Sequence, residues 1–244
     1  MTNKETIIKQ LKTTSNEIAQ KFDELYFDKI EKIAEELSIA FNNSLLIINY
    51  ERQEEISDGD FQAALLFWSG ARTIIGSLEL FRRGYHIEPL VILRHSLEII
   101  STGYCAHEDP QIAKNLSQDK SINSTKSISK AKQIQPIIGP MYGMLSQKIV
   151  HISTLHSVPT GSKGVPLPVG GMYDPETLKY KPMILSMILT TTEILNSLIE
   201  VAFINKIKNI RLWERVGGDV LKFNPSPEIK KMQEEMLGDF GGNF

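Results

Sequence analysis

Cysteine, membrane-length apolar runs and strand-like alternation are what this sequence lacks. Cys105 is the only cysteine among 244 residues, which excludes an intramolecular disulfide and a cysteine-based zinc site and fits a reducing compartment. The strongly apolar stretches reach only about ten residues and contain charges, so no segment is expected to span a membrane. The opening MTNKETIIKQ is polar and lacks the apolar run of a signal peptide. These features predict a cytoplasmic protein with no membrane partner.

The net charge of the chain does not indicate a class of binding partner. With 27 basic and 29 acidic residues the formal net charge is −2, and the isoelectric point is near 6.2. A protein with this balance has no overall attraction for nucleic acid, although 27 basic residues leave room for a local basic patch.

Apolar residues recur at helical spacings through most of the chain. Alternation typical of strands appears nowhere at useful length, so we expect an all-α protein, a helical bundle of about five main helices. We divide it into an N-terminal helical segment (1–57), a core bundle (58–208) and a C-terminal appendage (209–244). The stretch 12–17 is a weak point in the first helix.

Capping residues predict where the core helices begin and end. Asp58 or Asp60 is expected to cap a helix that runs to Arg83, with Gly84 as its left-handed C-terminal cap. The next helix opens at Glu88-Pro89. Asp109-Pro110 then begins a short helix, because proline is tolerated in a first turn.

Two stretches predict connections rather than core helices. Residues 117–130 are polar and serine-rich, typical of a surface connection followed by one short helix. Residues 157–175 hold four of the 11 prolines and four of the 16 glycines. That density predicts a long Pro/Gly-rich loop over one end of the bundle at 157–173. Beyond residue 209 we expect one amphipathic helix near 227–237.

The stretch VILRHSLEII (91–100) places ionisable side chains in an apolar helix. Arg94 and Glu98 lie four residues apart and therefore share a face. Buried Arg and Glu are rarely tolerated unless they are paired, so we expect the two to interact directly and to be mostly buried. The pair is either a structural tie or part of a pocket that binds a polar group. His95 lies to one side and need not join them.

A second polar set lies in YGMLSQKIVHIS (142–153). Tyr142 and Ser146 lie four residues apart, and His151 stands near the end of the same expected helix. The helix dipole favours histidine at that position, which is a sufficient structural reason for it; the other interpretation is a functional role.

Together these two stretches resemble a known group of proteins. RRGYHIEPLVILRHSLEII followed by MYGMLSQKIVH resembles a family of uncharacterised bacterial proteins. Its members carry Arg-x-x-x-Glu on one core helix and Tyr-x-x-Leu-Ser-x-x-x-x-His on a later one. That family is similar to the HEPN-like helical bundles, many of which act in toxin–antitoxin or abortive-infection systems. The resemblance covers about residues 60–205. It implies a helical bundle with a candidate site at Arg94, Glu98, Tyr142, Ser146 and His151.

The resemblance departs from the catalytic pattern. HEPN ribonucleases resemble one another in an Arg followed after four to six residues by His, and this chain has no such spacing. We therefore expect a non-catalytic binding or interaction role in bacterial defence or stress response, with a protein or RNA as partner. The alternative is a metal-independent ribonuclease in which Arg94 clamps the phosphodiester and His151 acts as acid and base.

Other chemistry finds little support in the sequence. A di-iron site needs Glu-x-x-His motifs, and this chain offers only the reversed His95-x-x-Glu98. No phosphate-binding, dinucleotide or zinc signature is present, so we expect no cofactor and no metal. A triad of Ser146, His151 and Glu98 would lack the sharp turn and oxyanion hole that such a serine uses.

The stretch 178–208 bears on assembly. Its apolar residues wrap most of the helix circumference, whereas one bundle core covers only a stripe. Either the C-terminal segment or a second protomer covers the remainder. The first long helix also has apolar residues on more than one face, so we favour a homodimer.

Overall fold

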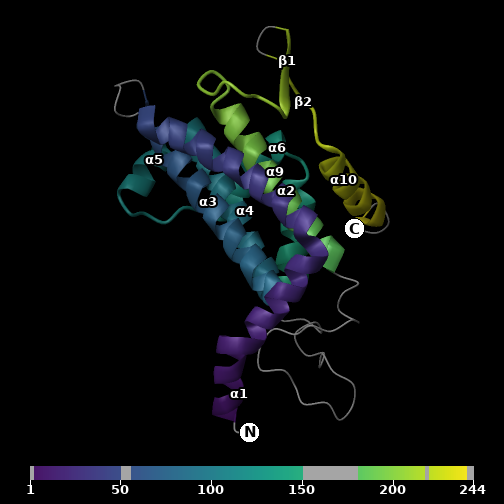
Figure 1. Cartoon of the computed structure of the whole chain (residues 1–244). Coiled ribbons are helices and arrows are strands. Elements are labelled where there is room, and N and C mark those ends of the chain that lie inside the picture. Colours follow the sequence, from purple (N-terminus) through teal and green to yellow (C-terminus); the bar gives the residue numbers. More distant parts are fainter. Residues whose placement is uncertain (1–2, 51–55, 151–180, 218–219, 241–244) are drawn as a thin grey trace.

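Four long helices form the body of the protein (Figure 1). The computed structural model describes residues 3–50, 56–150, 181–217 and 220–240. Helices α2 (Ser15–Tyr50), α3 (Asp58–Arg82), α4 (Glu88–Glu108) and α9 (Lys181–Ala202) are the long ones. α3 packs against α4 and α2, and α9 contacts α2, α3 and α4. The expected all-α helical bundle is confirmed.

Short helices complete one side of the bundle. They are α5 (Pro110–Ser117), α6 (Ser124–Ile134), α7 (Ile138–Met144) and the π-helix η3 (Leu145–Val150). α6 packs on α4, and α7 packs on α6. Residues 117–130 were expected to be a connection, and that prediction is wrong from residue 124 onward. The Asn123 side chain accepts a hydrogen bond from the Lys126 amide at 3.2 Å and so caps α6, which buries Ser127, Ile128 and Ala131.

The first helix is interrupted near the expected weak point. α1 (Asn3–Lys9) continues through the π-helix η1 (Gln10–Thr14) into α2. η1 overlaps the weak point at 12–17, where Thr and Ser compete for backbone hydrogen bonds. A kink at Tyr26, with φ −127° and ψ 20°, has no counterpart among the sequence predictions.

The predicted caps are mostly confirmed. Gly84 adopts φ 85°, and the Asp109 carboxylate accepts a hydrogen bond from the Gln111 amide at 2.9 Å. The cap of α3 was assigned to the wrong residue. Ser57, in extended conformation, accepts from the Asp60 amide at 3.1 Å, which leaves the Asp60 carboxylate free for other partners.

The C-terminal segment contains a hairpin that the sequence analysis missed. β1 (Trp213–Gly217) pairs antiparallel with β2 (Val220–Phe223), and Trp213 lies opposite Phe223. The glycine pair at positions 217 and 218 of the sequence was the available signal, because glycine pairs between β-rich runs mark hairpins. α10 (Pro227–Phe240) follows, at the position expected for an amphipathic helix.

One hydrophobic core joins these elements. It extends from Phe22 of α2 to Met232 of α10 and draws residues from all three expected segments of the chain. α9 lies at its centre. By length and composition Pro182–Ala202 is apolar enough to cross a membrane, but 89% of its most apolar window is buried inside the fold.

The C-terminal segment covers part of α9 within the chain. Trp213 donates its indole N–H to the Ser197 carbonyl at 3.0 Å, and α10 packs along α9. Residues 187–200 of α9 are all buried. A second protomer is therefore not needed to cover this helix, which removes that argument for a dimer.

Candidate functional site

Arg94 and Glu98 meet on α4 as predicted. The Arg94 NH2 nitrogen lies 3.1 Å from Glu98 Oε1, and the two side chains are only 25% and 14% exposed. Their four-residue spacing on one helix brings them together whatever the rest of the fold does. The predicted direct, largely buried pair is confirmed.

Tyr142 of α7 and Ser146 of η3 join this pair from across the bundle. Arg94 donates from Nε to Ser146 Oγ at 2.9 Å and from NH2 to the Tyr142 hydroxyl at 2.7 Å. The Tyr142 hydroxyl donates in turn to Glu98 Oε1 at 2.9 Å. The guanidinium carbon also lies 4.8 Å from the centre of the Tyr142 ring, within range of a cation–π contact. Four of the five candidate residues therefore form one network.

The fifth candidate, His151, lies outside the described residues. The expected loop at 157–173 also falls outside them. η3 ends at Val150, the residue before His151.

Two neighbouring residues complete the network. Ser124, the first residue of α6, donates to Glu98 Oε1 at 3.1 Å. Ser124 is not among the predicted site residues, because the polar stretch 117–130 predicts a surface connection. His95 Nδ1 lies 3.5 Å from Glu98 Oε2, and its side chain is 62% exposed. The three-residue spacing of His95 and Glu98 was the signal available for that contact.

The network is largely satisfied by the protein itself. Glu98 Oε1 is close to three donors, from Arg94, Tyr142 and Ser124, and the glutamate neutralises the arginine charge. Charge-assisted hydrogen bonds of this kind are roughly twice as strong as neutral ones. The arrangement ties α4 to α6, α7 and η3, and its main effect is to hold these helices in register.

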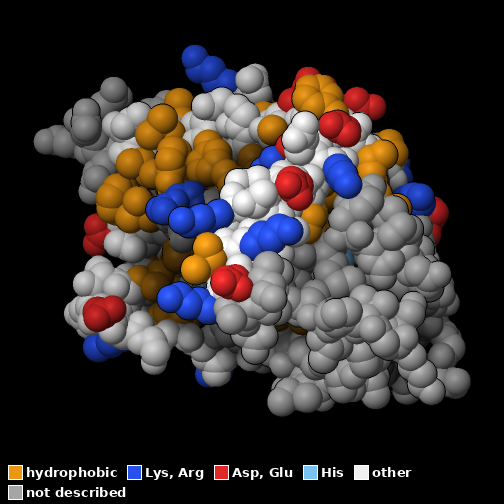
Figure 2. All heavy atoms as spheres, turned by 60° about the horizontal axis from the view of Figure 1, so that its bottom comes forward, with side chains coloured by type: hydrophobic (Ala, Val, Ile, Leu, Met, Phe, Trp, Pro, Cys, Tyr) orange, Lys and Arg blue, Asp and Glu red, His pale blue; other side chains and the backbone are white. Residues whose placement is uncertain are grey.

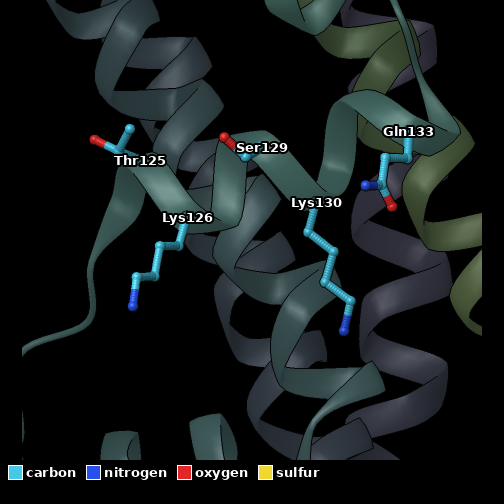
Figure 3. Close-up of a pocket in the computed structure, with 5 residues that line it drawn as sticks. All are labelled: Thr125, Lys126, Ser129, Lys130 and Gln133. Carbon is cyan, nitrogen blue, oxygen red and sulfur yellow. The ribbon is translucent and has the colours of Figure 1, made fainter.

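α6 presents a basic surface beside the network. Thr125, Lys126, Ser129, Lys130 and Gln133 line a shallow depression of about 330 Å³ (Figure 3). The Lys126 and Lys130 side chains extend to the same side of the helix. In the part of the chain that the structure describes, neither lysine has an ion-pair partner. Two lysines flanked by hydroxyl groups provide suitable donors for a phosphate or carboxylate group.

A second ionic cluster joins α3, α4 and the turn after α9. Asp60, 7% exposed, contacts His107 Nδ1 at 2.6 Å and forms an ion pair with Lys206. Burial alone would raise the pKa of Asp60, but hydrogen bonds to His107 and Lys206 outweigh it and hold that pKa well below its usual range. The His107 ring also packs edge-on against Phe203, with ring centres 5.6 Å apart. These contacts hold α3, α4 and the turn after α9 together at this end of the bundle.

The described residues contain no group of three or more His, Cys, Asp or Glu side chains that could hold a metal ion. Cys105 is buried, and burial raises the pKa of its thiol. A buried thiol of this kind is a poor nucleophile.

Comparisons with known proteins assign no relative to this chain. No family model matches it, and neither a curated protein nor a solved structure shows significant similarity.

Proposed function

We propose that this protein acts by binding an anionic partner, an acidic segment of another protein, through the basic surface of α6. The observation that carries the proposal is the pair Lys126 and Lys130 on one side of α6, which has no ion-pair partner among the described residues. Arg94, the phosphodiester clamp of the ribonuclease alternative, is already held by Ser146, Tyr142 and Glu98.

The geometry of Arg94 argues against catalysis. A phosphodiester clamp uses the planar fork of arginine to give two parallel hydrogen bonds. Here Nε and NH2 already donate to protein groups, and Glu98 supplies a competing negative charge. Recruiting Arg94 to a substrate would leave the largely buried Glu98 carboxylate without its cation, which is costly.

The α6 surface, in contrast, is open and unneutralised. Lys126 and Lys130 lie four residues apart, a spacing at which like charges repel by about 0.2–0.5 kcal/mol on an isolated helix. An anion placed between them would relieve this repulsion. The hydrogen bond from Ser124 to Glu98 anchors the start of α6 to α4, so the lysines stand on a fixed support. The formal net charge of −2 gives the chain no overall attraction for a polyanion, so the attraction depends on this local basic surface.

The setting of this function is proposed from the resemblance to HEPN-like bundles. From this resemblance we infer a role in bacterial defence or stress response, in the cytoplasm. The all-α bundle and the meeting of Arg94, Glu98, Tyr142 and Ser146 support this proposal.

The second candidate function is a metal-independent ribonuclease. One observation favours it: Arg94 contacts Ser146 on η3, the helix that ends directly before His151. π-Helical turns also occur frequently at functional sites. In this alternative Arg94 clamps the phosphodiester and His151 moves the proton.

Fluorescence anisotropy separates the two functions. Labelled poly-glutamate peptide and labelled RNA are each titrated with the full chain at low salt and neutral pH in EDTA, and the RNA is then checked for cleavage. We expect the peptide to bind and the RNA to remain intact. Lys126→Glu/Lys130→Glu should weaken peptide binding at least tenfold, whereas the control Lys208→Glu/Lys222→Glu, at two exposed lysines, should not.

Other results would decide against the proposal. Equal loss of binding in both double variants would show non-specific attraction and overturn the role of α6. Preferential binding of RNA without cleavage would identify RNA as the partner instead. RNA cleavage that is lost in both Arg94→Lys and His151→Ala would establish the ribonuclease.

A further inference from the structure

The first helical stretch projects beyond the body of the bundle. The body ends where Arg83, after α3, donates to Ser15 Oγ at 3.2 Å and to Asn16 Oδ1 at 3.0 Å. Residues 3–14 continue past this point as α1 and η1, a length of about 18 Å at 1.5 Å per residue. Among the described elements, they pack substantially only on each other and on the start of α2 (Figure 1).

This projecting stretch carries uncovered apolar side chains. Ile7, Ile8 and Leu11 are 45%, 43% and 67% exposed. Figure 2 turns this end of the molecule forward, and hydrophobic side chains lie exposed on that face of the molecule beside lysine and arginine. Covering these apolar side chains would remove apolar surface from water, so the projecting stretch gains stability from a partner.

A second uncovered apolar side chain lies further along the same helical stretch. Leu25 of α2 is 56% exposed, although Phe22 nearby is fully packed against Phe81. The chain thus presents uncovered apolar side chains both before and after Ser15.

The charges on the two sides of Ser15 are opposite. Residues 3–14 contain three lysines and one glutamate, whereas residues 15–31 contain five acidic residues and two lysines. Glu17, Glu24 and Asp28 are exposed, as are Lys4, Lys9 and Lys12. A helix with a basic first half and an acidic second half is complementary to its own antiparallel copy.

We propose that two copies of this chain associate through residues 3–31, packed antiparallel about a two-fold axis near Asn16. Ile7 of one copy then lies against Leu25 of the other, with Leu11 one turn closer to the axis, and each contact occurs twice, as in any isologous interface. The lysines of α1 and η1 lie beside Glu24 and Asp28 of the second copy. This interface does not involve α6, so it stands independently of the binding function proposed above.

Light scattering on the full chain tests the interface. We expect a mass of twice 27.5 kDa at a protein concentration of about 50 µM, which lies above the dissociation constant of a micromolar dimer. Ile7→Glu/Leu11→Glu should give the single-chain mass. The control Val216→Glu/Val220→Glu changes exposed apolar residues on the hairpin and should remain dimeric. Circular dichroism confirms that each variant is folded. A single-chain mass for the unchanged protein, or an unaltered dimer in Ile7→Glu/Leu11→Glu, overturns the proposal.

Charge reversal tests the antiparallel arrangement itself. Lys4→Glu/Lys9→Glu/Lys12→Glu makes both halves acidic, and Glu17→Lys/Glu24→Lys/Asp28→Lys makes both halves basic. Each variant alone should lose dimerisation at low salt, and an equimolar mixture should recover it as a heterodimer. A mixture that stays at the single-chain mass contradicts the arrangement, because only opposed halves in antiparallel register predict the rescue.

Discussion

The Tyr142 hydroxyl bridges Arg94 and Glu98: it accepts from Arg94 NH2 at 2.7 Å and donates to Glu98 Oε1 at 2.9 Å. The bridge joins residues 44 and 48 positions apart in the chain. Because one hydroxyl satisfies both members of the ion pair, the packing of α7 on α4 depends on an oxygen atom that no apolar residue can replace.

Removal of that oxygen should destabilise the fold. Tyr142→Phe keeps the ring over Arg94 but deprives two partly buried charged groups of a partner, at a cost of about 1–3 kcal/mol. Urea unfolding measures the loss. Tyr85→Phe is the control, since no partner of the Tyr85 hydroxyl is found among the described residues, and it should change stability by less than about 0.5 kcal/mol. Equal effects from both variants would contradict a bridging role for Tyr142.

The ion pair itself should show strong coupling in a double-mutant cycle. Arg94→Met alone leaves Glu98 without its cation, and Glu98→Leu alone leaves Arg94 without its anion, so each is destabilising. The double variant should cost less than the sum by about 0.5–3 kcal/mol, because it leaves neither charge unpaired. Additive losses in urea unfolding would show that the two residues act separately.

Two glycines of α3 should respond oppositely to alanine. A Cβ on Gly70 would lie 2.4 Å from Ile100 Cγ2, where α3 crosses α4, whereas a Cβ on Gly76 would meet nothing within 4 Å. Overpacking at Gly70→Ala should cost about 1–3 kcal/mol. Gly76→Ala should gain up to about 1 kcal/mol from helix propensity alone. Thermal unfolding of both variants checks this, and a stabilised Gly70→Ala would show that the two helices can separate freely.

The buried Glu193 should make stability fall as pH rises. Burial, with a smaller contribution from Glu36 and Glu228, raises the pKa of Glu193 from 4.5 to about 7, against the lowering effects of Ser226 and Lys32. The protonated form is favoured in the fold, so its contribution is complete below pH 4.5 and is lost between pH 4.5 and 7. The change is on the order of 3 kcal/mol.

Substitution isolates this effect. Glu193→Gln cannot ionise, so its unfolding free energy should fall less between pH 5 and pH 8 than that of the unchanged protein. Glu214→Gln, at an exposed position on β1, serves as the control and should keep the original slope. Parallel slopes for all three proteins would show that Glu193 is already ionised in the fold.

Asp60 should act in the opposite direction at acid pH. Its pKa lies below the usual value, so its stabilising contribution is present above pH 3.8 and is lost as the pH falls below that value. Asp60→Asn should lower the free energy of unfolding by on the order of 3 kcal/mol at neutral pH. The unfolding free energy of this variant should also fall less than that of the unchanged protein as the pH is lowered. The exposed neighbour Asp58→Asn should leave both quantities unchanged, as followed by urea unfolding at pH 7 and pH 3.

Contacts between residues close together in the chain followed from the sequence alone. Arg94 and Glu98 meet because four residues make one turn of α4, and Gly84 ends its helix because glycine adopts the left-handed conformation without strain. The all-α class follows likewise from helical periodicity repeated along the chain. In each case the interacting groups lie within a few residues of one another.

Contacts between segments far apart in the chain depended on how the helices pack together. Ser124 reaches Glu98 because α6 packs on α4. The polar composition of the first part of α6 had instead predicted a surface connection. The hairpin at 213–223 is held partly by Trp213 against Ser197 of α9, a contact that no local pattern encodes. Which segment buries the apolar faces of α9 also depended on how the elements pack, and the apolar residues of α9 alone did not predict it. Long-range contacts depend on how every element is placed at once, and for that reason the spacing of residues along one helix could not predict them.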